Sequence, residues 1–305
     1  MQNKNKTTVP PYLKKGSHVR ILATARKIDR EAVEPAINLL ESWGLRVSLG
    51  AHLFDIADQF AGTAENRLED LQTALDDESV DMVWCARGGY GTVKLLDKLN
   101  LNSFREKPKW VAGYSDVTAL LLHLYTHCNI STLHCTMPIN ISHDDLENKS
   151  IMCLKHFVFG NSMSYPLSSH PLNIPGTCKG ELYGGNLSML NSLLGSNTIN
   201  ANQLSKKILF LEDLDEYLYH IDRMMMNLER NGILDELSGV LVGGMTDMND
   251  NAVPFGKSAE EIIFDYFTDR NIPVFFNAPL GHKGDNLPLP IGKKVEIKNN
   301  KLYVL

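Results

Sequence analysis

KWVAGYSDVTALLL, residues 109–122, is the stretch that decides the fold, because it joins a short strand directly to an apolar helix. The apolar run Trp110–Ala112 is typical of a buried strand, and a second apolar run, with helical character, begins at Val117. Between them, Gly113–Asp116 interrupts both patterns. A strand that turns sharply into a helix presents the residue at the bend to solvent and to the first free N–H groups of the helix.

Ser115, at this bend, has two interpretations. It could be the nucleophile of an elbow, where an exposed hydroxyl lies beside donors that hold an oxyanion. The surrounding sequence is Gly-Tyr-Ser-Asp rather than Gly-x-Ser-x-Gly, so the usual hydrolase pattern does not apply. Ser115 or Asp116 could instead cap the helix, and the stretch by itself favours the cap.

Strands and helices alternate along the first half of the chain. Strands are predicted at 19–25, 47–49, 80–86, 110–112 and 130–135. Helices are predicted at 29–43, from 63 onward, at 92–100 and from 117 onward. This alternation predicts an α/β fold with a parallel sheet covered on both faces.

The second half has a different character. Residues 160–180 are rich in Ser, Pro, Gly and Asn, which is typical of a linker. Strands are predicted at 208–211, 240–244 and 274–277, with helices after 181–194 and from 218 to 232. The final segment VEIKNNKLYVL predicts a hairpin with a primed turn at Asn299–Asn300. We therefore expect two domains, residues 1–165 and 166–305, the second with more antiparallel pairing.

Composition narrows the function classes. The chain has 305 residues, of which 43% are hydrophobic and 22% charged, as in ordinary globular proteins. Its net charge of −6 gives no reason to expect nucleic acid or an anionic membrane as partner. The first 20 residues contain no apolar signal segment, so we expect a cytoplasmic protein whose five scattered cysteines are reduced thiols.

The loop Arg87–Gly91, RGGYG, follows a predicted strand and precedes a predicted helix. Such a loop exposes backbone N–H groups that could cradle an anion, or could complete an oxyanion hole with the N–H of Asp116. It lacks both the P-loop and the GxGxxG pattern. The glycines could also serve only a tight turn, but a turn does not explain Arg87, so we favour a site role.

A catalytic base must be sought among ten histidines. His123 and His127 lie one helical turn apart but have no acidic companion at metal-ligand spacing, so we expect no metal and no cofactor. His282 lies in a glycine-flanked loop after a predicted strand, and Glu212 ends another strand. A carboxylate there could orient an imidazole, but spacing alone does not join these residues.

Five motifs occur in order from about Gly16 to the C-terminus: RGGYG at 87–91, GYSD at 113–116, GGNLS at 184–188, LED at 211–213 followed by EYLYHIDRMMMNL, and GH at 281–282. Together they closely resemble the LD-carboxypeptidases, a family of serine peptidases that includes the microcin C immunity enzymes. The resemblance implies a flavodoxin-like nucleophile domain and a smaller, swivelling, barrel-like domain that carries the catalytic Glu and His.

By this resemblance the catalytic triad is Ser115, Glu212 and His282, and the oxyanion donors are the N–H groups of Gly88 and Asp116. Arg87 and Tyr90 are the substrate-binding candidates, with Arg87 either contacting a substrate carboxylate or bracing the loop. One departure is visible, because the family's His-Gly-Pro-Met is replaced by HCTM at 134–137. It concerns the expected pocket wall, and so the substrate, but leaves the triad intact.

The implied reaction is release of the terminal D-Ala from cytoplasmic murein tetrapeptides during peptidoglycan recycling, in a site formed by both domains. The partners expected are a murein peptide and a second copy of the chain in a homodimer. Two alternatives stay open. One is an immunity-type peptidase that cleaves an aminoacyl-nucleotide antibiotic on an aromatic platform. The other is a non-catalytic protein that binds an anion with the RGGYG loop.

Overall fold

A computed structural model describes residues 7–305 and divides them into two compact units. The first unit runs to residue 161 and includes the short segment 287–292. The second unit comprises residues 162–286 and 293–305. The chain therefore crosses between the units three times, whereas the sequence analysis expected one crossing near residue 165.

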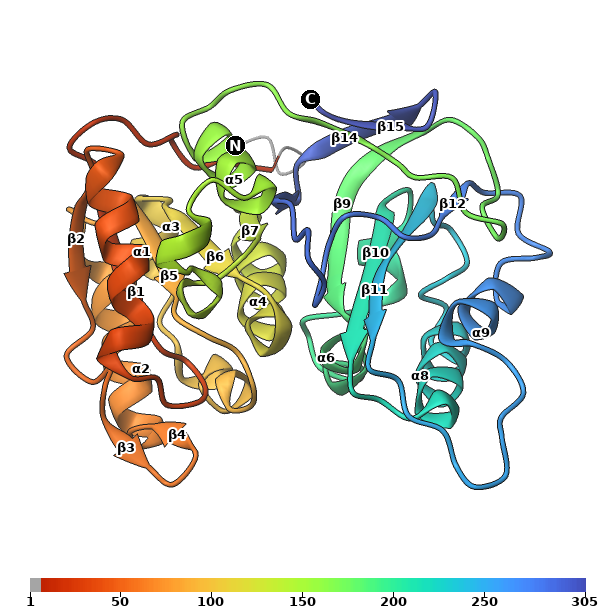
Figure 1. The fold of residues 1–305 in the computed structure, drawn as a ribbon, viewed down its shortest axis with the longest axis horizontal. Coiled ribbons are helices and arrows are strands. Elements are labelled where there is room, and N and C mark those ends of the chain that lie inside the picture. Colours follow the sequence, from red (N-terminus) through yellow and green to blue (C-terminus); the bar gives the residue numbers. More distant parts are fainter. Residues whose placement is uncertain (1–6) are drawn as a thin grey trace. The chain divides into compact units, whose positions relative to one another are not determined.

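The first unit is built on a six-stranded sheet with the order β13-β7-β6-β5-β1-β2 (Figure 1). Its strands are β1 (His18–Leu22), β2 (Arg46–Leu49), β5 (Met82–Cys85), β6 (Trp110–Gly113), β7 (Thr132–His134) and β13 (Leu289–Ile291). All neighbours pair in parallel except β13, which runs antiparallel to β7. The five strands other than β13 have the flavodoxin-like order, so the predicted parallel sheet is confirmed.

Helices connect these strands in right-handed crossovers, which place α1 and α5 on one face of the sheet and α2, α3 and α4 on the other. The helices are α1 (Arg30–Ser42), α2 (Ala64–Asp76), α3 (Asn102–Glu106), α4 (Thr118–Cys128) and α5 (Lys149–Val158). The 3-10 turns are η1 (Thr92–Lys94), η2 (Leu96–Lys98), η3 (Ser115–Val117), η4 (Pro138–Asn140) and η5 (His143–Asp145). A small hairpin, β3 (Ile56–Ala57) and β4 (Phe60–Ala61), precedes α2.

The stretch 109–122 lies at the centre of this unit. Every residue of β6 is buried, and so is α4 from Thr118 to Tyr125. Trp110 is fully buried, and its indole N–H donates to the carbonyl oxygen of Pro11 at 3.1 Å. The apolar runs identified in the sequence are thus the inner layer of the sheet and the helix that packs on it.

The second unit contains a curled, half-barrel sheet of seven strands in the order β12-β11-β10-β9-β14-β15-β8. Its strands are β8 (Ser164–Pro166), β9 (Cys178–Asn186), β10 (Ile208–Leu214), β11 (Gly239–Thr246), β12 (Val274–Phe275), β14 (Lys294–Lys298) and β15 (Lys301–Val304). Strands β9 to β12 pair in parallel, while β9, β14, β15 and β8 pair antiparallel. The expectation of mixed pairing in this half is confirmed.

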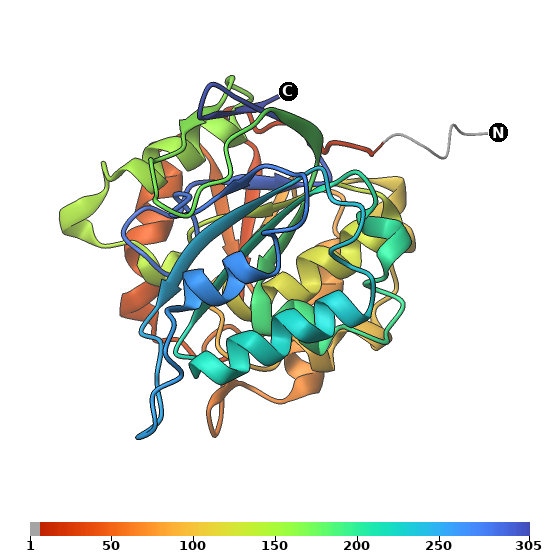
Figure 2. The same cartoon turned by 90° about the vertical axis from the view of Figure 1, so that its right-hand side faces the viewer.

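Helices of the second unit cover one face of this sheet. They are α6 (Leu187–Ser192), α7 (Ala201–Leu204), α8 (Leu218–Arg230) and α9 (Ala259–Asp265). Figure 2 shows α8 and α9 side by side against the strands. Helix α8 turns its apolar residues Ile221, Met225 and Leu228 into the core, as its helical spacing predicted.

One local prediction fails. The helix expected at 92–100 is replaced by the two short 3-10 turns η1 and η2. The Gly-Gly pair at 184–185 lies inside β9. A Cβ atom at Gly184 would lie 1.9 Å from the carbonyl oxygen of Phe210, so this close approach of β9 to β10 requires glycine.

Among residues 7–305, no helix has the length and apolar character needed to cross a bilayer.

The hairpin at Asn299–Asn300 gives a test of the turn geometry. Both residues have a φ of 52°, as a primed turn requires. Asn300→Gly should leave the unfolding midpoint unchanged or raise it, whereas Asn300→Ala should lower stability by about 1 kcal/mol, because Ala is strained at positive φ. Urea unfolding of the full chain measures both. Equal midpoints for the two variants would contradict the assigned turn.

Candidate active site

Ser115 occupies the bend between β6 and α4. Its φ is 63°, which places a residue other than glycine in the left-handed region. Neither Tyr114 nor Val117, the residues that precede η3 and α4, makes a side-chain capping hydrogen bond. Neither Ser115 nor Asp116 occupies a capping position, so the capping role favoured by the local sequence is wrong. The backbone at the half-buried Ser115 instead has the strained geometry of an elbow residue.

The RGGYG loop lies against this bend. It follows β5, which is the neighbour of β6, so both loops leave the same edge of the sheet. A Cβ atom at Gly88 would lie 2.8 Å from the Cβ of Ser115, 2.9 Å from its Oγ and 3.3 Å from the backbone nitrogen of Asp116. Only a glycine fits there, and its backbone lies beside the first N–H groups of the helical turn.

Arg87 and Tyr90 flank the two central glycines of the loop. Arg87 donates from Nη1 to the carbonyl oxygen of Lys27 at 2.9 Å, so it braces the loop against the segment that follows β1. Tyr90 is 45% exposed, and its ring lies 6.2 Å from the ring of Phe60. The ammonium of Lys94 lies 5.2 Å from the Tyr90 ring centroid. Tyr90 therefore offers an accessible aromatic surface next to a cation.

In the second unit the structure brings Glu212 and His282 together. Glu212 lies in β10 with its side chain fully buried, and its Oε2 is 2.7 Å from Nδ1 of His282. The loop that carries His282 reaches this position because Gly281 has a φ of 93° and lies against Glu212. A Cβ atom at Gly281 would lie 2.6 Å from the Cβ of Glu212. The structure thus contains the predicted hydrogen bond between this carboxylate and this imidazole.

Burial and nearby negative charge shift the pKa of His282 in opposite directions. Burial is the largest single effect and lowers the pKa of the imidazole. The hydrogen bond to Glu212, the charge of that carboxylate and the charge of Asp213 together outweigh burial and raise the pKa above its ordinary value. A carboxylate that accepts from Nδ1–H also selects the tautomer in which Nε2 carries the lone pair. This nitrogen is then the one able to accept a proton.

Asp213 completes a polar network beside this pair, and the sequence analysis gave it no role of its own. Its carboxylate accepts hydrogen bonds of 2.8 Å from the side chain of Asn186 and from the backbone N–H of Ser188. Burial and the adjacent charge of Glu212 raise the pKa of Asp213 to about 7. Only the shared occurrence of these residues in the GGNLS and LED motifs signals the network in the sequence.

The remaining histidine and tryptophan candidates have structural explanations. His123 and His127 lie in α4 with ring centroids 4.3 Å apart, and burial followed by the charge of His127 lowers the pKa of His123 to about 4. Trp43, Trp84 and Trp110 are at most 7% exposed, so none presents a ring to solvent. The three tryptophans are therefore core residues.

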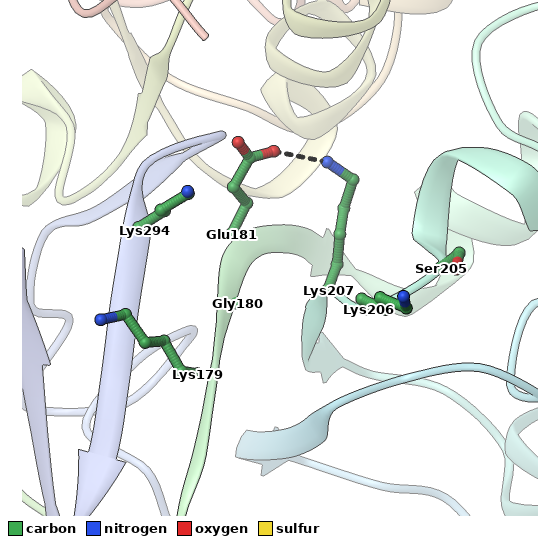
Figure 3. A pocket seen from close by; sticks show the side chains of 7 residues that line it. All are labelled: Lys179, Gly180, Glu181, Ser205, Lys206, Lys207 and Lys294. Carbon is green, nitrogen blue, oxygen red and sulfur yellow. Dashed lines mark hydrogen bonds and ion pairs between the residues drawn. The ribbon is translucent and has the colours of Figure 1, made fainter. Parts of the chain in front are cut away.

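A pocket of about 340 Å³ opens in the second unit, at the opposite end of β9 and β10 from Glu212 (Figure 3). It is lined by Lys179, Gly180, Glu181, Ser205, Lys206, Lys207 and Lys294. Lys207 forms a 2.7 Å ion pair with Glu181, and Lys294 lies opposite Glu181 in the strand register. Lys179 lies opposite Glu296 in the same ladder. These lysines thus face carboxylates of their own sheet, and we assign the pocket no ligand.

Comparison with known families gives two matches that together cover most of the chain. Residues 19–135 match the LD-carboxypeptidase N-terminal domain, and residues 179–297 match the LD-carboxypeptidase C-terminal domain. Ser115 and the RGGYG loop fall within the first match. Glu212 and His282 fall within the second.

Individual proteins give the same result. A probable murein peptide carboxypeptidase of Bacillus subtilis (strain 168) is 34% identical over 292 residues, which cover 93% of this chain and 90% of that protein. A crystal structure of muramoyltetrapeptide carboxypeptidase from Oxalobacter formigenes aligns with a TM-score of 0.84 at 25% identity, covering 94% of this chain and 97% of the other. The microcin C7 self-immunity protein MccF aligns with a TM-score of 0.85 over 98% of both chains, and at 18% identity it shows the fold alone.

The opposing effects on His282 can be separated by titration. In Glu212→Gln the charge of this residue is removed while burial remains, so the pKa of His282 should fall. NMR of the imidazole ring measures this shift. Glu216→Gln is the matched control, because Glu216 lies 3.0 Å from a different histidine, His220. An unchanged His282 titration in Glu212→Gln would contradict the assigned contact.

Proposed function

The chain belongs to the LD-carboxypeptidase family, and we propose that it releases the terminal D-Ala from murein tetrapeptides with Ser115 as the nucleophile. The observation that carries the proposal is the left-handed bend at Ser115, which lies against Gly88 at the edge of a parallel sheet. Serine nucleophiles of α/β hydrolases are mounted in this way. The known relatives named for murein peptides support the substrate class.

In the proposed reaction the hydroxyl oxygen of Ser115 attacks the carbonyl carbon of the scissile amide. Nε2 of His282 accepts the hydroxyl proton and then donates it to the leaving amine as the C–N bond breaks. An ester between Ser115 and the shortened peptide remains. Water, activated by the same imidazole, then hydrolyses this ester and restores the serine. The mechanism requires His282 to reach Ser115 in the active enzyme.

Glu212 has a double role in this scheme. Its hydrogen bond to Nδ1 fixes the imidazole orientation, and its charge stabilises the imidazolium that forms during each half-reaction. The raised pKa of His282 has a kinetic consequence. The neutral base is populated only as the pH rises through this pKa, so the acid limb of kcat/KM should lie above the ordinary histidine range.

The backbone N–H groups of Gly88 and Asp116 are the proposed oxyanion donors. Gly88 lies close both to the Ser115 hydroxyl and to the backbone nitrogen of Asp116. Donors that are already oriented cost no reorganisation when charge develops on the substrate oxygen. Losing one such donor reduces the rate by about 10²–10³-fold in other serine peptidases.

The proposed substrate bond joins the L-centre of a diamino acid to a terminal D-Ala. The terminal carboxylate needs a cation, and Arg87 and Lys94 lie on or next to the RGGYG loop. Because Nη1 of Arg87 braces the loop, the substrate would contact the remaining N–H groups of the guanidinium. The exposed ring of Tyr90 would contact the adjoining peptide. Cytoplasmic recycling and a homodimeric state stay predictions.

The same tests would also reveal either of two alternative functions. An immunity-type peptidase shares the fold, but the three tryptophans are buried and offer no exposed platform for a nucleobase. A non-catalytic protein could bind an anion at the RGGYG loop and would keep that affinity without Ser115. Such a protein would release no product from any peptide.

Ser115→Ala should fold normally and lose turnover by roughly 10⁴–10⁶-fold, because the nucleophile is removed. His282→Ala should be impaired to a similar degree, and the double variant should lose little more, since a triad acts as a unit. Steady-state hydrolysis of a murein tetrapeptide measures all three, with Ser103→Ala as a control in the same unit. Multiplicative losses in the double variant would show that the two residues act separately.

The substrate is tested by mass spectrometry of digests. A tetrapeptide ending in D-Ala should release free D-Ala, while a D-Ala-D-Ala pentapeptide and an all-L control should remain largely intact. A site that pairs polar substrate groups can reject analogues by about 10⁴-fold, since its own groups are otherwise left unpaired. Rapid cleavage of an aminoacyl-sulfamoyl nucleotide without release of D-Ala would favour the immunity-type enzyme.

A further inference from the structure

The side chain of Asp116 connects two loops that the proposed mechanism uses. Asp116 is 2% exposed, and its Oδ2 accepts a 2.9 Å hydrogen bond from the backbone N–H of Thr92. Thr92 begins η1, immediately after the RGGYG loop. The backbone N–H of the same Asp116 lies in the turn that begins at Ser115. One residue thus ties the end of the loop to the bend.

We propose that Asp116 is a positioning residue whose carboxylate holds the RGGYG loop against Ser115 and so fixes the spacing of the two oxyanion donors. The inference rests on the proposed function. It concerns the side chain of Asp116, whereas the donor itself is the backbone N–H of that residue. The link acts through Thr92 on the loop that carries Gly88.

The spacing between the two proposed oxyanion donors tolerates little change. Gly88 lies so near Ser115 that even a Cβ atom on it would be 2.9 Å from the hydroxyl oxygen. Oxyanion donors act at 2.7–3.1 Å from the charged oxygen, and supporting side chains must hold them to within about 0.5 Å. A loop released at Thr92 could move by more than this without unfolding the sheet.

Two other hydrogen bonds tie the loop and Thr92 to the segment that follows β1 rather than to the bend at Ser115. The carbonyl oxygen of Gly88 accepts from the N–H of Arg26 at 3.4 Å, and the hydroxyls of Thr24 and Thr92 are 2.8 Å apart. Both partners belong to the segment that follows β1. The hydrogen bond from Thr92 to Asp116 ties the loop to the turn at Ser115.

A buried cation, Arg67, interacts electrostatically with the carboxylate of Asp116. Oδ1 of Asp116 is buried and has no hydrogen-bond partner among residues 7–305, a costly arrangement for an isolated charge. Arg67 is also 2% exposed and lies close enough for its charge to interact with that of Asp116. Its guanidinium donates to the carbonyl oxygen of Thr24 at 2.8 Å and packs against Gly91. The same cation therefore supports both the carboxylate and the loop.

Two substitutions separate positioning from general stability. Asp116→Asn keeps an oxygen that can accept from Thr92, whereas Asp116→Ala leaves that buried N–H unsatisfied. We expect Asp116→Ala to lower kcat by about 10²-fold with little change in KM, because the donors matter most in the transition state. Asp116→Asn should retain most of kcat. Affinity for a peptide aldehyde, which forms a tetrahedral adduct with its own oxyanion, should fall in parallel with kcat.

Asp70→Ala is the matched control, because Asp70 is a 5% exposed carboxylate of the same unit that accepts from the N–H of His52 at 3.0 Å. Asp70→Ala should lose about as much thermal stability as Asp116→Ala but should keep its kcat and its affinity for the aldehyde. If Asp116→Ala does not fold, Asp116→Ser takes its place, since the shorter hydroxyl cannot span to Thr92. A kcat for the folded Ala or Ser variant within a few-fold of Asp70→Ala would overturn the inference. Loss of kcat in Asp116→Asn equal to that in Asp116→Ala would also overturn it.

Failure of the proposed function would give a different result. Full turnover in Ser115→Ala would remove the nucleophile from the scheme whatever Asp116 does. An inactive Ser115→Ala together with an Asp116→Ala variant as active as the Asp70 control would retain the nucleophile and reject only the positioning role.

Discussion

The left-handed backbone at Ser115 is the constraint on which the first unit depends. A φ of 63° costs a non-glycine residue about 1–3 kcal/mol. The conformation persists because β6 before it and α4 after it are buried, so straightening the bend would expose both. The same bend keeps the Ser115 side chain out of the core. It also places the N–H of Asp116 in a first helical turn, where N–H groups lack an intrahelical acceptor.

In the second unit, a close contact between a glycine backbone and a side chain positions the imidazole of His282. Gly281 lies against Glu212, and this contact brings His282 within 2.7 Å of a fully buried carboxylate. Burial opposes the charged imidazole, and Glu212 together with the charge of Asp213 outweighs this effect. An imidazole whose charged form is stabilised in this way is a better proton acceptor during catalysis. The cost is that less of the neutral base is present at a given pH.

The sequence predicted those features whose causes are local. The primed turn at Asn299–Asn300 and the buried runs of the sheets follow from turn chemistry and apolar spacing. The partner of Asp116 could not be predicted in this way, because Thr92 lies 24 positions earlier and its backbone N–H has no sequence signature. The short return of residues 287–292 to the first sheet was missed for the same reason, since it depends on the edge offered by β7.

The departure from the family pattern at HCTM, residues 134–137, introduces a cysteine that does not act as a nucleophile. Cys135 is fully buried, and burial raises the pKa of its thiol, so it is an inert core group rather than a second nucleophile. The carbonyl oxygen of Thr136 accepts from the indole N–H of Trp84 at 2.9 Å, which fixes the backbone of this segment without the proline of the family pattern. Substitution here can therefore change how the expected pocket wall is built without adding a reactive thiol.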